Sequence, residues 1–256
     1  MKIILVIPTY NEAENLPRLA EALFALPLPE LRLLIVDDAS PDGTGQIAEG
    51  LNERWPGRVR VLHRPGKLGL GTAYIQGFRL AMEDADAVGQ MDADFSHSPA
   101  KVVELAAALE TCDLAIGSRY VPGGSLDERW PFWRRWLSGF GNAYARTILH
   151  LPVQDATGGF RLWRREALQR LPLERVRSNG YVFQVEMAYL AHLHGLRIRE
   201  IPIHFADRRW GQSKMNLRIQ IEAAYRVWLL LSQYADLRHQ RAMSQNKPSS
   251  HYSSRW

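Results

Sequence analysis

The chain has a single cysteine, Cys112, among its 256 residues. A lone cysteine cannot form an internal disulfide, which excludes the small secreted domains that depend on several such bonds. The same usage is typical of a reducing compartment, so we expect a cytoplasmic location. With 46% hydrophobic residues at this length, the chain is expected to fold as one large domain or two small ones.

Long apolar runs are also missing. The apolar segment at residues 3–7 ends at Pro8 and is followed by polar residues, so it is too short for a secretory signal. The longest apolar run near the C-terminus covers only residues 227–231, far below the roughly 18 residues of a membrane-spanning helix. We therefore expect no transmembrane helix in this sequence.

Acidic residues are absent after Asp236, although four basic residues follow it, and the net charge is +5. A positive balance suits nucleic acid, an anionic lipid surface or a phosphorylated small molecule. The spacings of a zinc finger, an RNA-binding sheet or a helix-turn-helix are missing, so we do not expect a nucleic-acid partner.

Common signatures of phosphate and ester chemistry are missing as well. Residues 63–71, His-Arg-Pro-Gly-Lys-Leu-Gly-Leu-Gly, have the composition of a phosphate cradle or of a turn with structural glycines. They form neither a P-loop nor a dinucleotide fingerprint, because Gly-Lys-Ser/Thr is absent and Tyr74 stands where a third glycine should be. There is no Gly-x-Ser-x-Gly elbow, and no orienting partner is evident for His63, His97 or His150.

The first half alternates strand-like and helix-like segments. Short apolar runs separated by segments of helical spacing predict parallel strands covered on both faces, which is a doubly wound α/β sheet. Strands are expected at residues 3–7, 33–36, 59–62, 87–91 and 114–117, and helices at 12–26, 45–54, 71–83 and 99–109.

The second half is less regular, and we expect it to complete one domain over residues 1–240. Its nucleotide-binding half would be about 1–120 and its acceptor half about 121–240. Helices are expected at 130–149, 181–194 and 215–237, a strand at 197–205, and a strand or turn at 158–163. Residues 241–256 are polar and basic with little to bury, which predicts a disordered tail.

Polar clusters follow four of the predicted strands, at residues 8–12, 37–40, 92–94 and 118–120. Ligands of such sheets bind at the carboxyl ends of the strands, so these clusters indicate one shared cleft. In the third cluster, Asp92 and Asp94 are one residue apart after an apolar run. Buried carboxylates need a partner, and this pair favours a hard divalent cation that also binds substrate phosphates over an exposed acidic turn.

Two further carboxylates, Asp37 and Asp38, follow the second predicted strand. A carboxylate accepts well from ribose hydroxyls or a ring N–H, and we favour Asp38 as such a ligand. The alternative is a cap for the following helix, for which Asp42 is the better candidate. Glu186, on a predicted helix, is left open between a helix anchor and a ligand.

Cations and aromatic residues gather in the second half. The cations are Arg119, Arg134, Arg208, Arg209 and Lys214. Each alone is typical of a solvated surface, but together they predict a clamp for a second anion, with 205–214 as a closing loop. Tryptophans at 130, 133 and 136 alternate with arginines, and the final helix is amphipathic. These two elements favour contact with a membrane surface over simple helix packing or an oligomer contact.

Several segments, taken together in this order, resemble a known family. Pro-Thr-Tyr-Asn-Glu at 8–12, Val-Asp-Asp-Ala-Ser-Pro-Asp-Gly-Thr at 36–44 and Met-Asp-Ala-Asp-Phe-Ser-His-Ser-Pro at 91–99 resemble family 2 glycosyltransferases of GT-A fold. Gly-Ser-Arg-Tyr at 117–120, Asp-Ala-Thr-Gly-Gly-Phe-Arg at 155–161, and Asp-Arg at 207–208 with Gly-Gln-Ser-Lys at 211–214 are similar to dolichyl-phosphate (polyprenol-phosphate) mannose synthases. The resemblance covers residues 1 to about 238.

The resemblance implies inverting transfer of mannose from GDP-mannose to a polyprenyl phosphate, with Mg²⁺ or Mn²⁺. It implies that Asp94, Arg119, Arg208 and Lys214 are catalytic and that Arg119, Arg134 and Ser138 bind the acceptor phosphate. Asp92, Asp94 and Ser96 would hold the metal, although some relatives have glutamine at the position of Ser96. The donor would be held by Pro8, Tyr10, Glu12, Val36, Asp38, Asp92, Ala93 and Asp94.

The chemistry is consistent with this family, because a lipid phosphate is largely ionised near neutral pH and needs no base. The alternatives are a related transferase that uses UDP-glucose or another nucleotide sugar, and a non-catalytic nucleotide-sugar-binding subunit. A nucleotidyltransferase would need a glycine-rich basic loop at 8–12, which is instead uncharged or acidic. We expect a peripheral protein on the cytoplasmic face of a membrane, and leave open an oligomer or a membrane subunit as partner.

Overall fold

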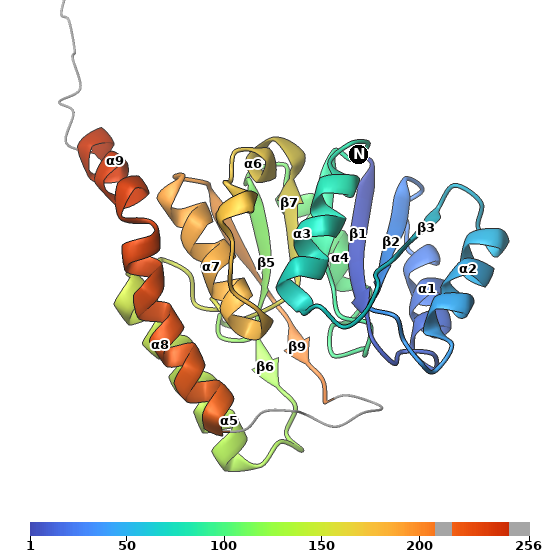
Figure 1. Ribbon diagram of the computed structural model, residues 1–256, viewed down its shortest axis with the longest axis horizontal. Helices are drawn as coiled ribbons and strands as arrows, with labels where there is room; N and C mark the ends of the chain where they lie inside the picture. The colour runs from blue at the N-terminus through green and yellow to red at the C-terminus, as the bar shows by residue number, and fades with distance from the viewer. Residues whose placement is uncertain (208–216, 246–256) are drawn as a thin grey trace, which may run out of the picture.

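The computed structural model describes residues 1–207 and 217–245. Within them, the centre of the molecule is a seven-stranded sheet in the order β3-β2-β1-β4-β7-β5-β8 (Figure 1). Its strands are β1 (Ile3–Thr9), β2 (Leu31–Asp37), β3 (Val59–His63), β4 (Ala87–Gln90), β5 (Leu114–Ser118), β7 (Arg161–Arg164) and β8 (Ile198–Pro202). A small second sheet pairs β6 (Ser125–Leu126) with β9 (His204–Phe205).

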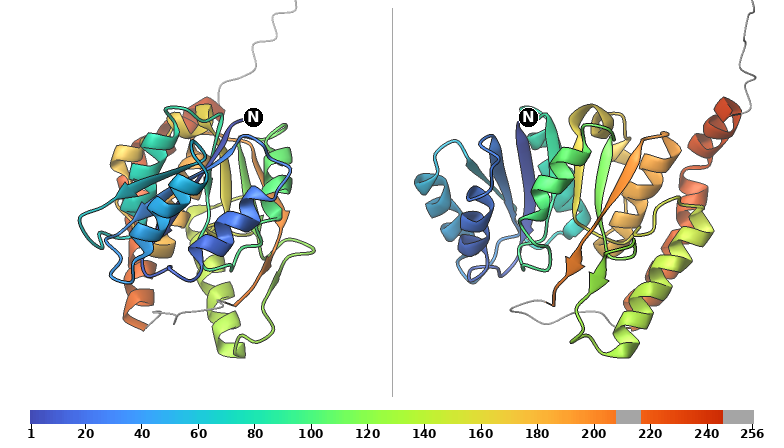
Figure 2. Two further views of the ribbon diagram at one scale, coloured as in Figure 1. Left: turned by 90° about the vertical axis from the view of Figure 1, so that its right-hand side faces the viewer. Right: turned by 180° about the vertical axis from the view of Figure 1, so that it is seen from behind.

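Helices cover both faces of the sheet. They are α1 (Leu16–Phe24), α2 (Thr44–Arg54), α3 (Leu70–Ala81), α4 (Lys101–Ala108), α5 (Phe132–Leu149), α6 (Arg165–Gln169), α7 (Gly180–Leu193), α8 (Leu217–Gln233) and α9 (Ala235–Gln245), with a 3-10 turn at Leu173–Arg175. Figure 1 shows α3, α6 and α7 on the near face, and Figure 2 shows α1 and α4 on the far face. The predicted α/β class, a doubly wound and mostly parallel sheet, is confirmed.

The central strands β1 and β2 are apolar along most of their length because both of their faces are buried. In β1, Ile3, Leu5 and Ile7 belong to the core under α1, α2 and α4. Ile4 and Val6 belong to the core under α3 and α7. This is why the strand reads as a continuous apolar run rather than an alternating one.

One strand runs against the others. β7 lies between β4 and β5 and is antiparallel to both, with Gly89 opposite Leu162 and Ala115 opposite Leu162. Because β7 runs in reverse, its first residues, and the segment 155–160 before it, lie at the edge where the parallel strands end. For residues 158–163 the sequence left open a strand or a turn. The structure shows a strand, which begins at Arg161.

Two predicted elements are each divided in two. The strand expected at 197–205 is β8 followed by β9, and these belong to different sheets. The helix expected at 215–237 is α8 followed by α9, with Tyr234 between them. Residues 215 and 216 lie outside the described residues.

Glu186 on α7 is hydrogen-bonded to the residues at the junction of α8 and α9. Its buried carboxylate accepts hydrogen bonds from the Tyr234 hydroxyl at 2.7 Å, the Gln233 amide at 2.9 Å and the Ser178 backbone N–H at 2.9 Å. Burial and the charge of Glu186 raise the pKa of Tyr234, so this hydroxyl remains a donor. Glu186 is therefore a helix anchor, which settles the alternative left open by the sequence.

The boundary predicted for the tail is wrong by several residues. α9 continues to Gln245, so residues 241–245 are helical rather than disordered. The rest of the expected tail, 246–256, lies outside the described residues. None of the helices in the described part of the chain is long and apolar enough to span a membrane.

Candidate active site at the carboxyl edge of the sheet

The polar clusters that follow β1, β2, β4 and β5 lie at one edge of the sheet, as predicted. β1 is hydrogen-bonded to β2 and β4, and Pro8 is opposite Val36 in the register. The side chain of Val36 is buried in the core, so a role in ligand binding would belong to its main chain. β5 is separated from β4 by β7, which places residues 155–160 between the third and fourth clusters.

Asp38 forms a buried ion pair with Arg64. The two atoms Nη1 of Arg64 and Oδ1 of Asp38 are 2.5 Å apart, and both side chains are almost inaccessible to solvent. Arg64 also donates to the Thr72 hydroxyl at 2.6 Å and to the Gly69 carbonyl at 3.3 Å. Arg64 thus joins segment 63–71 to Asp38 at the end of β2. Sequence reasoning did not identify this pairing.

The other residues of this region organise the loops. Asp37 accepts hydrogen bonds from the hydroxyls of Thr9 and Ser40, at 3.1 and 2.6 Å. Asp42 accepts from the backbone N–H of Thr44, the first residue of α2, at 3.1 Å, but the N-cap position is Gly43, which has no side-chain cap. The Lys67 ammonium lies 3.8 Å from the ring centre of Tyr10, and Glu12 accepts from the Asn15 amide at 2.7 Å.

Residues 92–97 form a tight loop after β4. The carboxylate of Asp94 accepts from the Ser96 backbone N–H at 3.0 Å, and Phe95 has a φ of 59°, which is unusual for a residue with a side chain. Asp92 is reached by the Tyr74 hydroxyl at 3.4 Å. Burial, and then the charge of Asp92, raise the pKa of Tyr74 well above its usual value, so Tyr74 acts as a donor.

The donor set of this loop suits a hard cation. The Ser96 hydroxyl is buried and has no hydrogen-bond partner in the described part of the chain. Two carboxylates and this hydroxyl are oxygen ligands, as Mg²⁺ and Mn²⁺ prefer. No group of three or more His, Cys, Asp or Glu side chains suited to a metal is found among the residues described. A cation here would therefore also need ligands from water or a bound phosphate.

The expected acceptor residues Arg119, Arg134 and Ser138 line a single cavity of about 310 Å³. Arg119 forms a bidentate pair with Asp155, with both N–O distances at 2.7 Å, and donates to Thr157 at 2.7 Å. Burial acts to lower the pKa of Arg119, but the charge and hydrogen bonds of Asp155 outweigh it and raise that pKa. The guanidinium is therefore charged and fixed in orientation.

The other two cavity residues are also held by neighbours. Arg134 contacts Asp207 at 3.2 Å and lies over the Trp130 ring at 3.7 Å, while Ser138 is 2.9 Å from the Tyr120 hydroxyl. Sequence reasoning gave no roles to Asp155 or Asp207, although both stand inside motifs that carry the family resemblance. Arg208 and Lys214 lie outside the described residues.

One aromatic residue, Phe205, separates this cavity from the loop at 92–97. It lines the cavity, its ring centre is 5.3 Å from that of His97, and the Arg119 guanidinium carbon is 5.4 Å from it. The next residue, Ala206, donates from its backbone to the Ser96 carbonyl at 3.1 Å. The two carboxylates and the three acceptor residues thus belong to neighbouring parts of one edge.

Residues 4–171 match the model of the family described as Glycosyl transferase family 2. This chain belongs to that family. It is therefore a glycosyltransferase, and the enzyme class predicted from the sequence is confirmed.

Two curated relatives match this family 2 glycosyltransferase over most of its length. The chain is 44% identical over 245 residues to undecaprenyl-phosphate mannosyltransferase of Micrococcus luteus, covering 93% of this chain and 98% of that protein. It is 42% identical over 228 residues to polyprenol monophosphomannose synthase of Mycolicibacterium smegmatis, covering 88% and 85%. The resemblance to polyprenol-phosphate mannose synthases is thereby confirmed.

The fold is shared with a solved glycosyltransferase of different sequence. Glucosyl-3-phosphoglycerate synthase from Mycobacterium tuberculosis, in complex with Mn²⁺, UDP and glucosyl-3-phosphoglycerate, gives a TM-score of 0.63 at 19% identity. The match covers 91% of this chain and 79% of that chain. It supports the GT-A-like fold of this glycosyltransferase.

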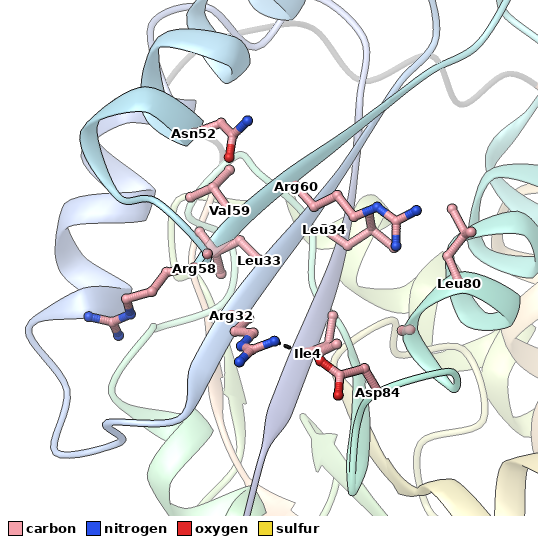
Figure 3. A pocket seen from close by; sticks show the side chains of 12 residues that line it. Ile4, Arg32, Leu33, Leu34, Asn52, Arg58, Val59, Arg60, Leu80 and Asp84 are labelled. Carbon is pink, nitrogen blue, oxygen red and sulfur yellow. Dashed lines mark hydrogen bonds and ion pairs between the residues drawn. The ribbon is translucent and has the colours of Figure 1, made fainter.

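A second cavity of the glycosyltransferase, of about 260 Å³, lies near the amino ends of the parallel strands, opposite the carboxyl ends where the site lies (Figure 3). It is lined by residues from the starts of β1, β2 and β3, among them Ile4, Leu33 and Val59. Asp84 contacts Arg32 there at 2.7 Å. The predicted site residues do not line this cavity, so it has no connection with the carboxyl-edge site.

Proposed function

We propose that this glycosyltransferase transfers mannose from GDP-mannose to a polyprenyl phosphate, with inversion at the anomeric carbon. The activities named for the two relatives support the proposal. In the structure it is carried by one observation, the single cavity lined by Arg119, Arg134 and Ser138.

The walls of that cavity fit an acceptor with a charged end and an apolar chain. The remaining lining includes Leu137 and Phe140 from α5 and Ala224 and Val227 from α8. Arginine binds phosphate through two N–H groups of its planar head. Asp155 already holds Arg119 in place, so little orientation is left to be fixed when the phosphate binds.

The reaction is a single displacement. An oxygen of the lipid phosphate attacks C1 of the sugar, the bond from C1 to the diphosphate oxygen breaks, and the electron pair leaves with GDP. The nucleophile is already ionised near neutral pH, so no protein base is needed. His97 is buried, and its ring is stacked against that of Phe160 with 4.9 Å between the ring centres.

We propose that Asp92, Asp94 and Ser96 hold Mg²⁺ or Mn²⁺ together with the donor diphosphate. When bound, such a cation stabilises the negative charge of the departing diphosphate. Asp94 is oriented by the Ser96 backbone N–H. Arg208 and Lys214 remain proposed phosphate ligands, and Pro8, Tyr10, Glu12, Val36, Asp38 and Ala93 remain proposed parts of the donor site.

A polyprenyl phosphate acceptor implies that the enzyme acts at a lipid surface. Helices α5 and α8 carry exposed aromatic side chains that suit such a surface. Phe132, Trp133, Trp136 and Phe140 of α5 are 54–76% exposed, and Tyr225 and Trp228 of α8 are 64% and 55% exposed. Exposed aromatic rings are characteristic of membrane interfaces. We propose peripheral contact through this face, on the cytoplasmic side of a membrane. A nucleotide half at about 1–120, an acceptor half at about 121–240, and an oligomer or membrane-subunit partner remain predictions.

The test is transfer of radiolabelled mannose from GDP-mannose to a short polyprenyl phosphate, with and without EDTA. We expect labelled lipid in the organic phase, a β-linked product from an α-linked donor by NMR, and loss of product with EDTA. Asp94→Ala should lower kcat at least about 100-fold, because a ligand of the metal is lost.

Asp84→Ala is the matched control, since it removes an exposed acid at the opposite edge of the sheet. It should leave transfer unchanged. Efficient transfer from UDP-glucose but not from GDP-mannose would overturn the proposed donor. Near-normal transfer by Asp94→Ala would overturn the metal role.

A further inference from the structure

Three buried polar side chains form a hydrogen-bonded row from β7 across β4 to α7. The indole Nε1 of Trp163 donates to Oε1 of Gln90 at 2.9 Å. Nε2 of Gln90 donates to Oε1 of Gln184 at 3.1 Å. Trp163 and Gln90 are 0% exposed and Gln184 is 3% exposed.

This row has only one possible direction. An indole N–H can donate but cannot accept, so Gln90 must turn its oxygen toward Trp163 and its nitrogen toward Gln184. Gln184 then accepts with its oxygen, and its own nitrogen is turned away from Gln90. The row therefore ends in the amide N–H donor of Gln184. The orientation of this amide is set by Trp163, through Gln90.

The donor end of Gln184 faces Gly159. A Cβ atom at Gly159 would lie 3.2 Å from Nε2 of Gln184 and 4.0 Å from Oδ1 of Asp92. Gly159 belongs to the segment that the reversed strand β7 brings to the carboxyl edge. The missing side chain leaves a space next to both an amide donor and a carboxylate acceptor.

We propose that Gln184 and Gly159 form part of the subsite for the transferred sugar, in which one sugar hydroxyl accepts a hydrogen bond from Nε2 of Gln184. A hydroxyl suits this space because it can accept from the amide and also donate to a carboxylate such as Asp92. An ionised phosphate oxygen can only accept, so it cannot pair with the amide and the carboxylate at once. The assignment rests on the proposed function, since it takes the site to bind a nucleotide sugar.

The consequence is a role for Gln184 in sugar specificity. Mannose and glucose differ only in the direction of the hydroxyl at C2. A site built to hydrogen-bond one hydroxyl discriminates strongly against a sugar that leaves the protein group unpaired. Gln184 is well suited to this because the row behind it prevents the amide from turning to suit the other epimer.

Two variants test the subsite in the full-length protein. Gly159→Ala places a methyl group in the space, 3.2 Å from Nε2 of Gln184, and Gln184→Met keeps a similar length but has no N–H donor. The measurements are kcat/KM with GDP-mannose and with GDP-glucose, and the Kd of GDP with Mn²⁺ by calorimetry. We expect mannose transfer to fall about tenfold in each variant, the loss of one hydrogen bond of about 1.4 kcal/mol. The mannose-to-glucose ratio should move toward one, while the Kd of GDP changes by less than about twofold, because GDP carries no sugar.

Glu186→Gln is the matched control. It alters a buried polar group on the same helix, but one that is hydrogen-bonded to Gln233 and Tyr234 and not to the row. It should lower the melting temperature and leave the mannose-to-glucose ratio unchanged. Unchanged mannose transfer in both Gly159→Ala and Gln184→Met, or a loss of GDP affinity equal to the loss of transfer, would show that the space does not bind the sugar. If the wild-type protein uses another nucleotide sugar, the proposed donor is wrong. The same variants, compared on that donor and its epimer, still decide the subsite.

Discussion

At the scale of single residues, the charged side chains of the carboxyl edge are organised in buried pairs. Arg119 and Asp155 have side-chain exposures of 8% and 0%, and Arg64 and Asp38 have 1% and 9%. Charges this deeply buried are tolerated because each is paired and hydrogen-bonded. The geometry of the two guanidinium groups therefore depends on their acidic partners, of which Asp155 need not touch the substrate.

Asp155→Asn should lower the free energy of unfolding at neutral pH by about 3–5 kcal/mol, because it leaves the Arg119 charge buried without a counterion. Burial alone would raise the pKa of Asp155, but Arg119 outweighs it and holds that pKa below its usual value. The pair therefore stabilises the protein fully above the unfolded-state pKa of about 3.9. This contribution is lost as the pH falls through the lower, folded-state pKa.

Urea unfolding between pH 2 and 7 measures both effects. The steep loss of stability below about pH 4 in the wild type should be shallower in Asp155→Asn. Asp113→Asn is the control, because its partner Arg197 is 65% exposed and exposed pairs contribute at most about 1 kcal/mol. An equal loss in the two variants would contradict the special role of the buried pair.

At the scale of elements, the close packing of α3 against the sheet depends on a glycine, Gly77. A Cβ atom at Gly77 would lie 2.3 Å from Cγ1 of Val6 and 3.2 Å from Cγ2 of Val36. These contacts are too short, so α3 can approach β1 and β2 this closely only without a side chain at Gly77. The approach places Tyr74, on the same helix, beside Asp92.

Gly77→Ala should destabilise the protein by about 1–3 kcal/mol, because the cost of overpacking exceeds the gain in helix propensity. Gly50→Ala, in the middle of α2, is the matched control. Nothing lies within 4 Å of a Cβ at Gly50, so this change should stabilise by up to about 1 kcal/mol. Thermal unfolding distinguishes the two, and stabilisation by both would show that α3 does not rest on Gly77.

At the scale of the whole molecule, the acceptor cavity and the exposed aromatic residues share two helices. α5 and α8 pack along one end of the sheet (Figures 1 and 2). Their inner residues line the cavity, whereas Trp133, Trp136 and Trp228 are exposed. This arrangement suits the proposed function, in which a lipid phosphate enters the cavity from a membrane surface with its chain still in contact with lipid.

The double variant Trp133→Ser, Trp136→Ser should lose at least about tenfold in binding to vesicles that contain anionic phospholipid, as judged by flotation. Each ring would otherwise bury apolar surface at the interface. The melting temperature should change little, since both side chains are 59–63% exposed. Met243→Ser, an exposed apolar residue of α9, is the control. Equal flotation of all three proteins would exclude α5 from membrane contact.

Local patterns were enough to predict most of the framework. The apolar runs and helical spacings gave strands and helices near their observed positions, since these patterns reflect burial on one or two faces of each element. They failed where an element's ends depend on distant contacts. Tyr234, at the junction of α8 and α9, is hydrogen-bonded to Glu186, 48 residues earlier. The division of β8 from β9 needs a second sheet that includes β6.

What the sequence by itself determined is the alternation of elements and the set of polar residues that follow the strands, because both are properties of neighbouring residues. Only the tertiary structure decided which of those residues meet. The partners Asp38 and Arg64 are 26 residues apart, Arg119 and Asp155 are 36 apart, and Gln90 and Gln184 are 94 apart. The reversed strand β7, which brings Gly159 to the site, is likewise a matter of sheet order. Such contacts are settled by which surfaces pack together in three dimensions, and no local pattern carries that information.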